Sequence, residues 1–247
     1  MAVGLSADGD YITRGSIPSG GAGTLSDGAF TNYFLGGWAY HPTSGNSNAA
    51  TSEGAVFNTV AGAREQQFGK DNTFGAGDHT GPQLRFIGNS DGSAQVVFGG
   101  GDQPPFDTWI YYALLDNSTD GMVAAWRTLA DGTWHSEVLT NNNAGSQYIN
   151  SFYVGSYGTT QVLFGHYAYI RARYGTGITL TDATTYAESD ATIAGDWGFW
   201  PLADNSDTAD TSGNSRTLTF GGTLTSETSP TFTVPSVPKR LMLMGIG

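Results

Sequence analysis

Cysteine is absent from this chain of 247 residues, so neither a disulfide nor a thiolate metal site can form. Lysine and glutamate number only two and five, which leaves little material for exposed helix surfaces. The 36 glycines and the 13% of aromatic residues instead favour many short strands joined by tight turns. The composition therefore predicts a β-rich protein whose stability comes from its core and from strand pairing.

Positive charge is also scarce, with ten basic residues against 22 acidic ones and a formal net charge of -12. Such a chain repels a phosphate backbone and an anionic bilayer, so we expect neither nucleic acid nor a membrane as partner. No segment approaches the run of about 18 apolar residues that a membrane-spanning helix needs. The residues after Met1 lack the basic and apolar regions of a secretory signal, which predicts synthesis in the cytoplasm.

Three consecutive strands in the middle of the chain organise the rest of the predicted fold. Positions 109–115 are apolar throughout, which predicts a strand that is covered on both faces. Turn-forming residues at 116–121 and the Asp131-Gly132 pair would connect this strand to two more. The tryptophans that we expect in the core of this meander are Trp109 and Trp126.

Other short apolar runs bounded by glycine or asparagine predict further strands. We expect residues 3–5 and 10–13 to form an opening hairpin, and a long aromatic strand at 30–41 to have a bulge or bend at Gly36-Gly37. A brief helix is expected to begin near Thr181. The remaining predicted strands are residues 54–60, 83–87, 94–98, 148–154, 161–174, 197–202, 217–220 and 231–234.

The order of several sequence segments resembles the laminin-G-like and concanavalin A-like jelly rolls. The segments are LSADGDYI, FTNYFLGGWAY, FDTWIYYALLDNSTDG, FYVGS and LFGHYAYIRARYGTGITLTDATTY. Residues 165–171 are similar to a glycine-led strand that recurs in this superfamily, and 200–202 with 210–214 resemble its W-x-L-x-D…D-x-S-G-N corner. The resemblance implies an all-β, two-sheet antiparallel jelly-roll sandwich with at most one short helix. This corner follows the last strands here, as in a variant seen in bacteriophage virion proteins.

Catalytic signatures are incomplete in this sequence. Glucanases of this fold use a Glu-x-Asp-x(-x)-Glu strand, and Glu188 and Asp190 supply its first two carboxylates, but Thr192 and Ile193 occupy the third position. The four histidines lack the spacing of a zinc site, and no G-x-S-x-G nucleophile motif is present. We therefore predict no enzymatic activity and no cofactor, and we place the Glu188 carboxylate in a solvated loop after the short helix.

Three aspartates in the segment DNSDTADTSGN have the oxygen ligands that calcium prefers. Their spacing lacks the ligand pattern of an EF-hand loop, and aspartates that bond their own backbone in tight turns explain the same composition. We expect structural turns here, with calcium binding as the alternative. The residues are Asp204, Asp207 and Asp210.

Strand alternation in residues 167–174 predicts one small or aliphatic face and one aromatic and basic face. Tyrosine and arginine are enriched in binding interfaces, so the second face is a candidate surface for a glycan or a protein. The alternative is that other parts of the protein cover this face and that its arginines pair with acidic residues. The candidate ligand-binding residues are Tyr167, Tyr169, Arg171 and Arg173.

The C-terminus combines a basic pair, Lys239-Arg240, with an uninterrupted apolar run. Such a run must be buried, either as a last strand of the sandwich or by pairing with a neighbouring subunit through strand addition. We assign residues 1–235 to one sandwich domain and residues 236–247 to this tail or last strand. The predicted assembly contacts are Leu241, Met242, Leu243 and Met244.

Together these observations favour a non-enzymatic structural protein of a bacteriophage virion, a decoration or tail-associated subunit, with glycan binding as a further role. Its partners would be copies of itself, other virion proteins and surface glycans. The alternative is a free extracellular lectin-like module that binds polysaccharide. A diverged glycoside hydrolase of the same fold is a weaker alternative.

Overall fold

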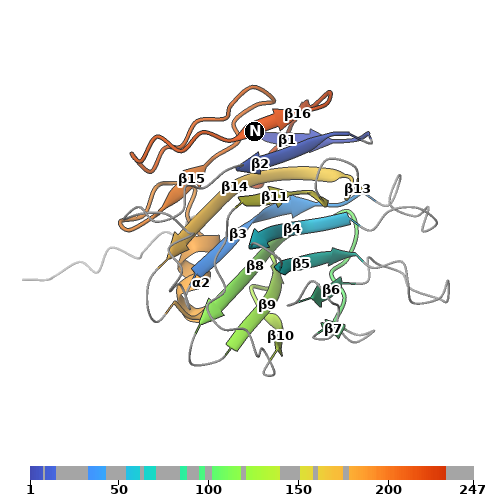
Figure 1. Ribbon diagram of the computed structural model, residues 1–247, viewed down its shortest axis with the longest axis vertical. Coiled ribbons are helices and arrows are strands. Elements are labelled where there is room, and N and C mark those ends of the chain that lie inside the picture. Colours follow the sequence, from blue (N-terminus) through green and yellow to red (C-terminus); the bar gives the residue numbers. More distant parts are fainter. Residues whose placement is uncertain are drawn as a thin grey trace, which may run out of the picture.

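The computed structural model describes residues 1–7, 9–14, 33–42, 54–61, 64–70, 84–87, 95–97, 102–117, 121–139, 151–157, 161–174 and 178–231. Two antiparallel sheets pack face to face, and one short helix covers part of the outer face of one sheet (Figure 1). The predicted all-β jelly-roll sandwich with one short helix is confirmed. Within these ranges, no helix has both the length and the hydropathy to cross a bilayer.

The first sheet, sheet A, contains eight strands among the described residues. Seven of them follow one another in the order β10-β9-β8-β3-β14-β1-β17, and β15 pairs with β14 beside this path. The strands are β10 (His135–Leu139), β9 (Gly121–Thr128), β8 (Trp109–Asn117), β3 (Tyr33–Tyr40), β14 (Gly165–Tyr174), β1 (Ala2–Leu5), β17 (Thr225–Glu227) and β15 (Gly198–Trp200).

The second sheet, sheet B, contains seven strands in the described part of the chain, in the order β16-β2-β11-β4-β5-β6-β7. They are β16 (Thr219–Gly221), β2 (Tyr11–Arg14), β11 (Ser151–Val154), β4 (Gly54–Ala61), β5 (Arg64–Lys70), β6 (Leu84–Ile87) and β7 (Gln95–Val97). A short separate pair joins β12 (Ser156–Tyr157) to β13 (Gln161–Val162). Sequence analysis missed β5, β12 and β17, because none of them shows an apolar run or a clear apolar alternation.

The described residues form two apolar clusters, one on each face of sheet A. The inner cluster lies between the sheets and includes Tyr112, Trp126 and Trp200, all almost fully buried. The outer cluster lies between sheet A and helix α2 (Leu180–Ala187). Because β8 contributes alternate residues to both clusters, the prediction that this strand is covered on both faces is confirmed.

Helix α2 forms where the sequence predicted a brief helix. Thr179 is its N-cap, and a capping box joins the side chains and backbone amides of Thr179 and Asp182. The Phe34 ring packs edge-on against Tyr186 with 4.9 Å between ring centroids. The Trp38 indole donates a hydrogen bond to the carbonyl oxygen of Ala187 at 3.1 Å, which fixes the helix end on the sheet.

The predicted meander is present, but one connection is longer than expected. β9 and β10 are joined by residues 129–134 rather than by a two-residue turn, although Gly132 has the predicted left-handed backbone with φ of +66°. The extra residues bring Trp134 onto the outer cluster. Trp126 lies in the inner core as predicted, whereas Trp109 is only half-buried at the margin of the outer cluster.

The predicted opening hairpin is wrong, because β1 belongs to sheet A and β2 to sheet B. The turn between them is held by Asp10, whose Oδ2 accepts hydrogen bonds from the backbone amides of Ser6 and Ala7, both at 2.9 Å. Its Oδ1 accepts a third from the amide of Thr223, at 2.8 Å, in the turn that joins β16 in sheet B to β17 in sheet A. One buried carboxylate therefore ties together two turns that cross between the sheets.

Part of the predicted C-terminal structure lies outside the described residues. This part includes positions 232–234 of the expected last strand and the proposed assembly contacts Leu241, Met242, Leu243 and Met244.

Candidate functional site

The four residues predicted to share one exposed face do not do so. A β-bulge in β14 lies between Ala168 and Arg171, and Tyr169 within it has a left-handed backbone with φ of 54°. The extra residue reverses the alternation, so Tyr167 points into the inner cluster together with Ile170. Tyr167 is fully buried, and its hydroxyl donates to the carbonyl oxygen of Leu163 at 2.7 Å. The predicted exposure of Tyr167 is therefore wrong.

The two arginines of this set reach the opposite side of the sheet and meet Asp196 there. Arg171 Nη1 lies 3.2 Å from Asp196 Oδ2, and Arg173 Nη1 lies 2.5 Å from Asp196 Oδ1. Arg171 is 1% exposed and stacks over the ring of Phe199 at 4.3 Å from its centroid. Burial lowers the pKa of Arg171, and the charge of Asp196 opposes this shift. The alternative interpretation, arginines covered and paired with an acidic residue, is the one observed.

Tyr169 stays at the surface. Its side chain is half-buried at the margin of the outer cluster, and its hydroxyl lies 3.4 Å from Ser229 Oγ. Its backbone amide donates to the carbonyl oxygen of Pro201 at 3.1 Å. A left-handed backbone is uncommon for a bulky residue, and the bulge keeps Tyr169 on the outer face of sheet A.

A row of half-buried aromatic side chains crosses the same outer face. Tyr40 on β3 lies directly opposite Trp109 on β8 and directly opposite His166 on β14. The centroids of Tyr40 and Trp109 are 5.8 Å apart, and those of Tyr40 and His166 are 5.3 Å apart with an interplanar angle of 16°. The next strand places Gly4 opposite His166, so side chains of β17 reach over it toward the row. We call Tyr40, Trp109, His166, Tyr169 and Glu227 the outer patch.

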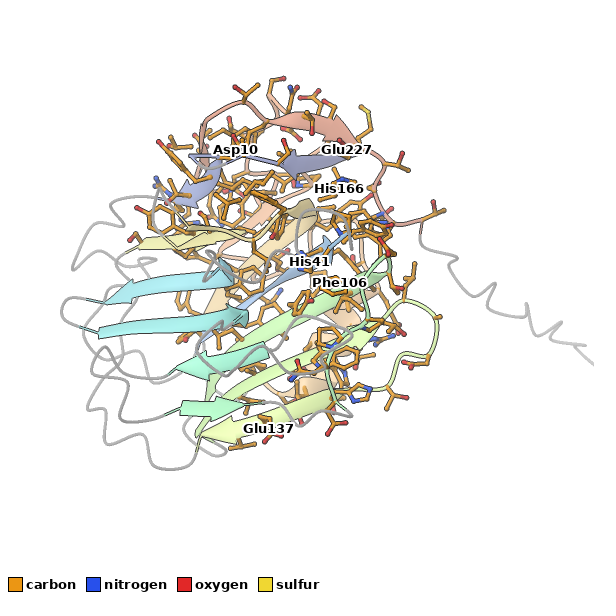
Figure 2. All side chains as sticks on the ribbon, turned by 90° about the vertical axis from the view of Figure 1, so that its right-hand side faces the viewer. Asp10, His41, Phe106, Glu137, His166 and Glu227 are labelled. Carbon is orange, nitrogen blue, oxygen red and sulfur yellow. The ribbon has the colours of Figure 1, made fainter. Side chains whose placement is uncertain are left out.

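Carboxylates lie beside two members of this row. At one end, His166 Nε2 lies 3.8 Å from Glu227 Oε2, and these side chains are 30% and 33% exposed. In the middle of the row, the Tyr40 hydroxyl donates to Asp107 Oδ1 at 3.4 Å. Burial, and then the charge and hydrogen bond of Asp107, raise the pKa of Tyr40. Figure 2 shows Glu227, His166 and Phe106, the neighbour of Asp107, on one side of the molecule.

The exposed residue Asp107 is held firmly by its backbone. Its amide donates to the carbonyl oxygen of His41 at 2.9 Å, and its φ of 55° is left-handed, a conformation that aspartate tolerates better than most residues. His41 in turn is 1% exposed and lies edge-on to the rings of Tyr112 and Tyr167. The carboxylate of Asp107 therefore has a fixed position beside Tyr40.

Helix α2 and the β9–β10 connection cover the other part of the outer face. Trp134 Nε1 donates to Thr184 Oγ1 at 2.9 Å, and Arg127 Nη2 pairs with Glu188 Oε1 at 3.2 Å. Glu188 and Asp190 are exposed in the turns that follow α2, so the predicted loop location of these carboxylates is confirmed. They do not lie on a strand, as the two carboxylates of the glucanase pattern would.

A second aromatic group lies where β9 meets the edge strand β10. The rings of Trp126 and His135 stack with 4.0 Å between centroids and an interplanar angle of 4°. The carbonyl oxygen of Asp102 accepts from Trp126 Nε1 at 2.8 Å, and its carboxylate lies 3.2 Å from His135 Nδ1. These bonds anchor one end of the segment 102–108, whose other end carries Asp107.

The three aspartates considered for calcium bond to nearby backbone amides. Asp204 Oδ1 accepts from the amide and hydroxyl of Ser206 at 2.8 and 2.6 Å, and these bonds lower the pKa of Asp204. Asp207 accepts from the amide of Ala203, and Asp210 accepts from the amides of Phe199, Ser212 and Arg216. The predicted turn chemistry is confirmed. In the ranges that the structure describes, no group of three or more His, Asp or Glu side chains could hold a metal ion.

Neither a protein-family model nor a curated protein matches the chain. A native heptameric SAP-like pentraxin from Limulus polyphemus is similar in structure, with a TM-score of 0.50 and 9% identity over 89% of this chain and 94% of the pentraxin. A candidate carbohydrate binding protein from Bacteroides ovatus has a TM-score of 0.52 and 12% identity over 93% of this chain and 61% of that protein. Tailspike protein 2 of Escherichia coli O157:H7 bacteriophage CAB120 has a lower TM-score of 0.47 and 10% identity, over 74% of this chain and 24% of the tailspike. At such identities the first two likenesses show a shared fold alone.

Proposed function

We propose that this protein is a non-catalytic jelly-roll module that binds glycans through the outer patch. The observation that carries the proposal is the row of Trp109, Tyr40 and His166, flanked by Asp107 and Glu227, on the part of sheet A that α2 leaves uncovered. The similar fold of a candidate carbohydrate binding protein supports the same function.

The patch combines the two kinds of contact that a sugar needs. Half-buried aromatic rings offer apolar surface to the C–H groups of a sugar, and their polar edges stay at the surface. Carboxylates accept hydrogen bonds from sugar hydroxyls, and two of them lie beside the row. Because neighbouring strands are about 4.8 Å apart, a row across three strands extends about 10 Å, which suits a short oligosaccharide.

Two substitutions in the row and one matched control test this function. Tyr40→Ala and His166→Ala should weaken binding to an array of bacterial and plant glycans at least tenfold. Tyr153→Ala is the control, because Tyr153 is also half-buried in an aromatic pair, with Tyr11 at 6.4 Å, but lies on the outer face of sheet B. Glycan binding that survives both row substitutions, or that is lost only in Tyr153→Ala, would contradict the proposal. Circular dichroism melting of all three variants checks that folding is retained.

The proposed absence of catalysis rests on the placement of the candidate carboxylates. Glu188 pairs with Arg127 beyond the end of α2, and Asp190 is exposed in the same turn region. The glucanase pattern would need Glu188 and Asp190 on one strand together with a third carboxylate, and both residues instead lie in the turns after α2. Incubating the protein with each glycan that it binds and measuring new reducing ends tests this; sustained release would show that the module is an enzyme.

We further propose that the module is a subunit of a bacteriophage particle, a decoration or tail protein. The support is the order of the sequence motifs, in which the corner at 200–202 and 210–214 follows the last strands. The free extracellular lectin is the alternative location. Mass spectrometry of purified particles distinguishes the two, because a free lectin would be found only in the supernatant.

Assembly through the C-terminal tail belongs to this second proposal. The apolar run Leu241, Met242, Leu243 and Met244 follows Pro235 and Pro238, which remove backbone donors and suit an extended arm. Deleting residues 236–247 should leave the melting temperature unchanged and abolish incorporation into oligomers or particles. A lower melting temperature would instead show that the run belongs to the sandwich. Normal incorporation would show that it makes no assembly contact.

A further inference from the structure

We infer that the outer patch selects uncharged or amine-bearing glycans and rejects acidic ones. The inference rests on the proposed function and concerns the ligand class of the same surface. It follows from the distribution of charge around the row, where carboxylates face the surface and guanidinium groups are turned inward.

Two carboxylates border the aromatic row. Asp107 is exposed beside Tyr40, and Glu227 is one-third exposed beside His166. Glu227 Oε1 accepts from Thr225 Oγ1 at 2.9 Å, so its carboxylate is oriented on β17 rather than free to swing away. Together the two carboxylates place negative charge beside the middle and one end of the aromatic row.

The arginines cannot balance this charge at the surface. Arg171 and Arg173 are bound to Asp196, and Arg127 is bound to Glu188. Arg216 donates to the carbonyl oxygen of Trp197 and lies over its ring at 4.2 Å. The other basic residues on described strands, all in sheet B, are Arg14, Arg64, Lys70 and Arg85.

One positive group does border the patch. The α-amino group of Met1 donates to Ser229 Oγ at 3.0 Å, and Ser229 also meets the Tyr169 hydroxyl. Within the described part of the chain, the patch therefore has two carboxylates, the imidazole of His166 and one ammonium at its border. It has no guanidinium that could form the paired bonds by which proteins recognise carboxylate or sulfate groups.

These charges set the expected discrimination. A ligand carboxylate about 6 Å from a protein carboxylate in water is disfavoured about threefold, so two such neighbours give about tenfold weaker binding. The same two carboxylates favour an amine-bearing sugar by a similar factor. Both effects should shrink at high ionic strength, because surface charges about 10 Å apart are screened in 0.1 M salt and far more in 1 M salt.

The experiment compares a glycan with its own charged derivative on the intact protein. The strongest uncharged glycan from the array is oxidised at its primary hydroxyls to carboxylates, and both forms are titrated by calorimetry at pH 8 in low salt. We expect the oxidised form to bind about tenfold more weakly. Asp107→Asn and Glu227→Gln should each recover about threefold of this loss, whereas Asp131→Asn, at an exposed turn, should recover none.

The outcomes separate the inference from the function on which it rests. If the oxidised glycan binds equally or more tightly while Tyr40→Ala still abolishes binding, the charge selection is wrong. The outer patch would then still be the glycan site. A loss that Asp107→Asn and Glu227→Gln do not recover would also overturn it. Binding of no glycan, or binding that Tyr40→Ala leaves unchanged, would overturn the proposed function itself.

Discussion

Replacing Asp10 with alanine should destabilise the whole sandwich, although the residue lies in a turn at its margin. Its buried carboxylate accepts three backbone hydrogen bonds, from Ser6, Ala7 and Thr223. Hydrogen bonds to a charged group contribute about 1.5–3 kcal/mol each, but water can reach the turn residues and recover part of this. We therefore expect Asp10→Ala to lower the free energy of unfolding by about 2–4 kcal/mol, a large share of the stability of a typical domain.

Urea denaturation followed by tryptophan fluorescence measures this loss, and a second aspartate supplies the control. Asp204 also accepts bonds from a neighbouring amide and hydroxyl, but it is only partly buried and its side chain bonds within its own turn, so it ties no second segment to the first. Asp204→Ala should therefore lower the free energy of unfolding much less than Asp10→Ala does. If the two variants unfold at the same urea concentration, the tie between the two crossing turns does not stabilise the fold as we describe.

Further predictions concern the core, the tyrosines and the acidic turn. Trp126→Ala should lower the free energy of unfolding, measured by urea denaturation, by about 3–5 kcal/mol because the ring is buried. Trp109→Ala should lower it clearly less because Trp109 is half-buried. Equal losses would contradict the two-cluster description. Burial raises the pKa of Tyr111 and Tyr112, so their protons are held more tightly in the folded state, and stability should be full below about pH 10 and fall above it. Absorbance at 295 nm should show these tyrosines ionising only as the protein unfolds, and their ionisation in the native state would refute the prediction. Excess calcium or a chelator should shift the melting temperature by no more than a few degrees if residues 204–210 form only structural turns, and a larger shift would indicate calcium binding.

The sequence was sufficient to predict the meander strands and the helix because their signals are local. The apolar run of β8, the turn at Gly132 and the cap at Thr179 each show a preference that neighbouring residues alone determine. The prediction of an opening hairpin was wrong because the placement of these strands depends on contacts between residues that are far apart in sequence. The sequence Asp8-Gly9 between two short strands is typical of a hairpin turn. The strands instead enter different sheets, and Asp10 between them bonds to Thr223, which is far away in sequence.

The prediction of the candidate site was wrong because of the conformation at one residue, Tyr169. Strict alternation along β14 would have exposed Arg171 with Tyr167, and the bulge at Tyr169 moved them to opposite faces. Its partner strand β3 carries Gly37, where a side chain would collide with Ile170. The glycine pair therefore did mark a bulge, but the extra residue lies in β14 rather than in the glycines' own strand. The outer patch was missed because Tyr40, Trp109 and His166 become neighbours only through strand pairing.

The position of β1 has a consequence for the way this chain folds. Its residue Val3 pairs with Tyr167, and its residue Ala2 pairs with Glu227, so this strand leaves the ribosome long before either of its partners. Closing loops of this length is entropically costly, and all-β topologies of high contact order fold on the order of milliseconds to seconds. Until then the strand keeps unpaired edges, which other chains can capture. Folding of the sandwich should therefore be a post-translational event, and chains truncated before β14 should aggregate rather than accumulate as partly folded protein.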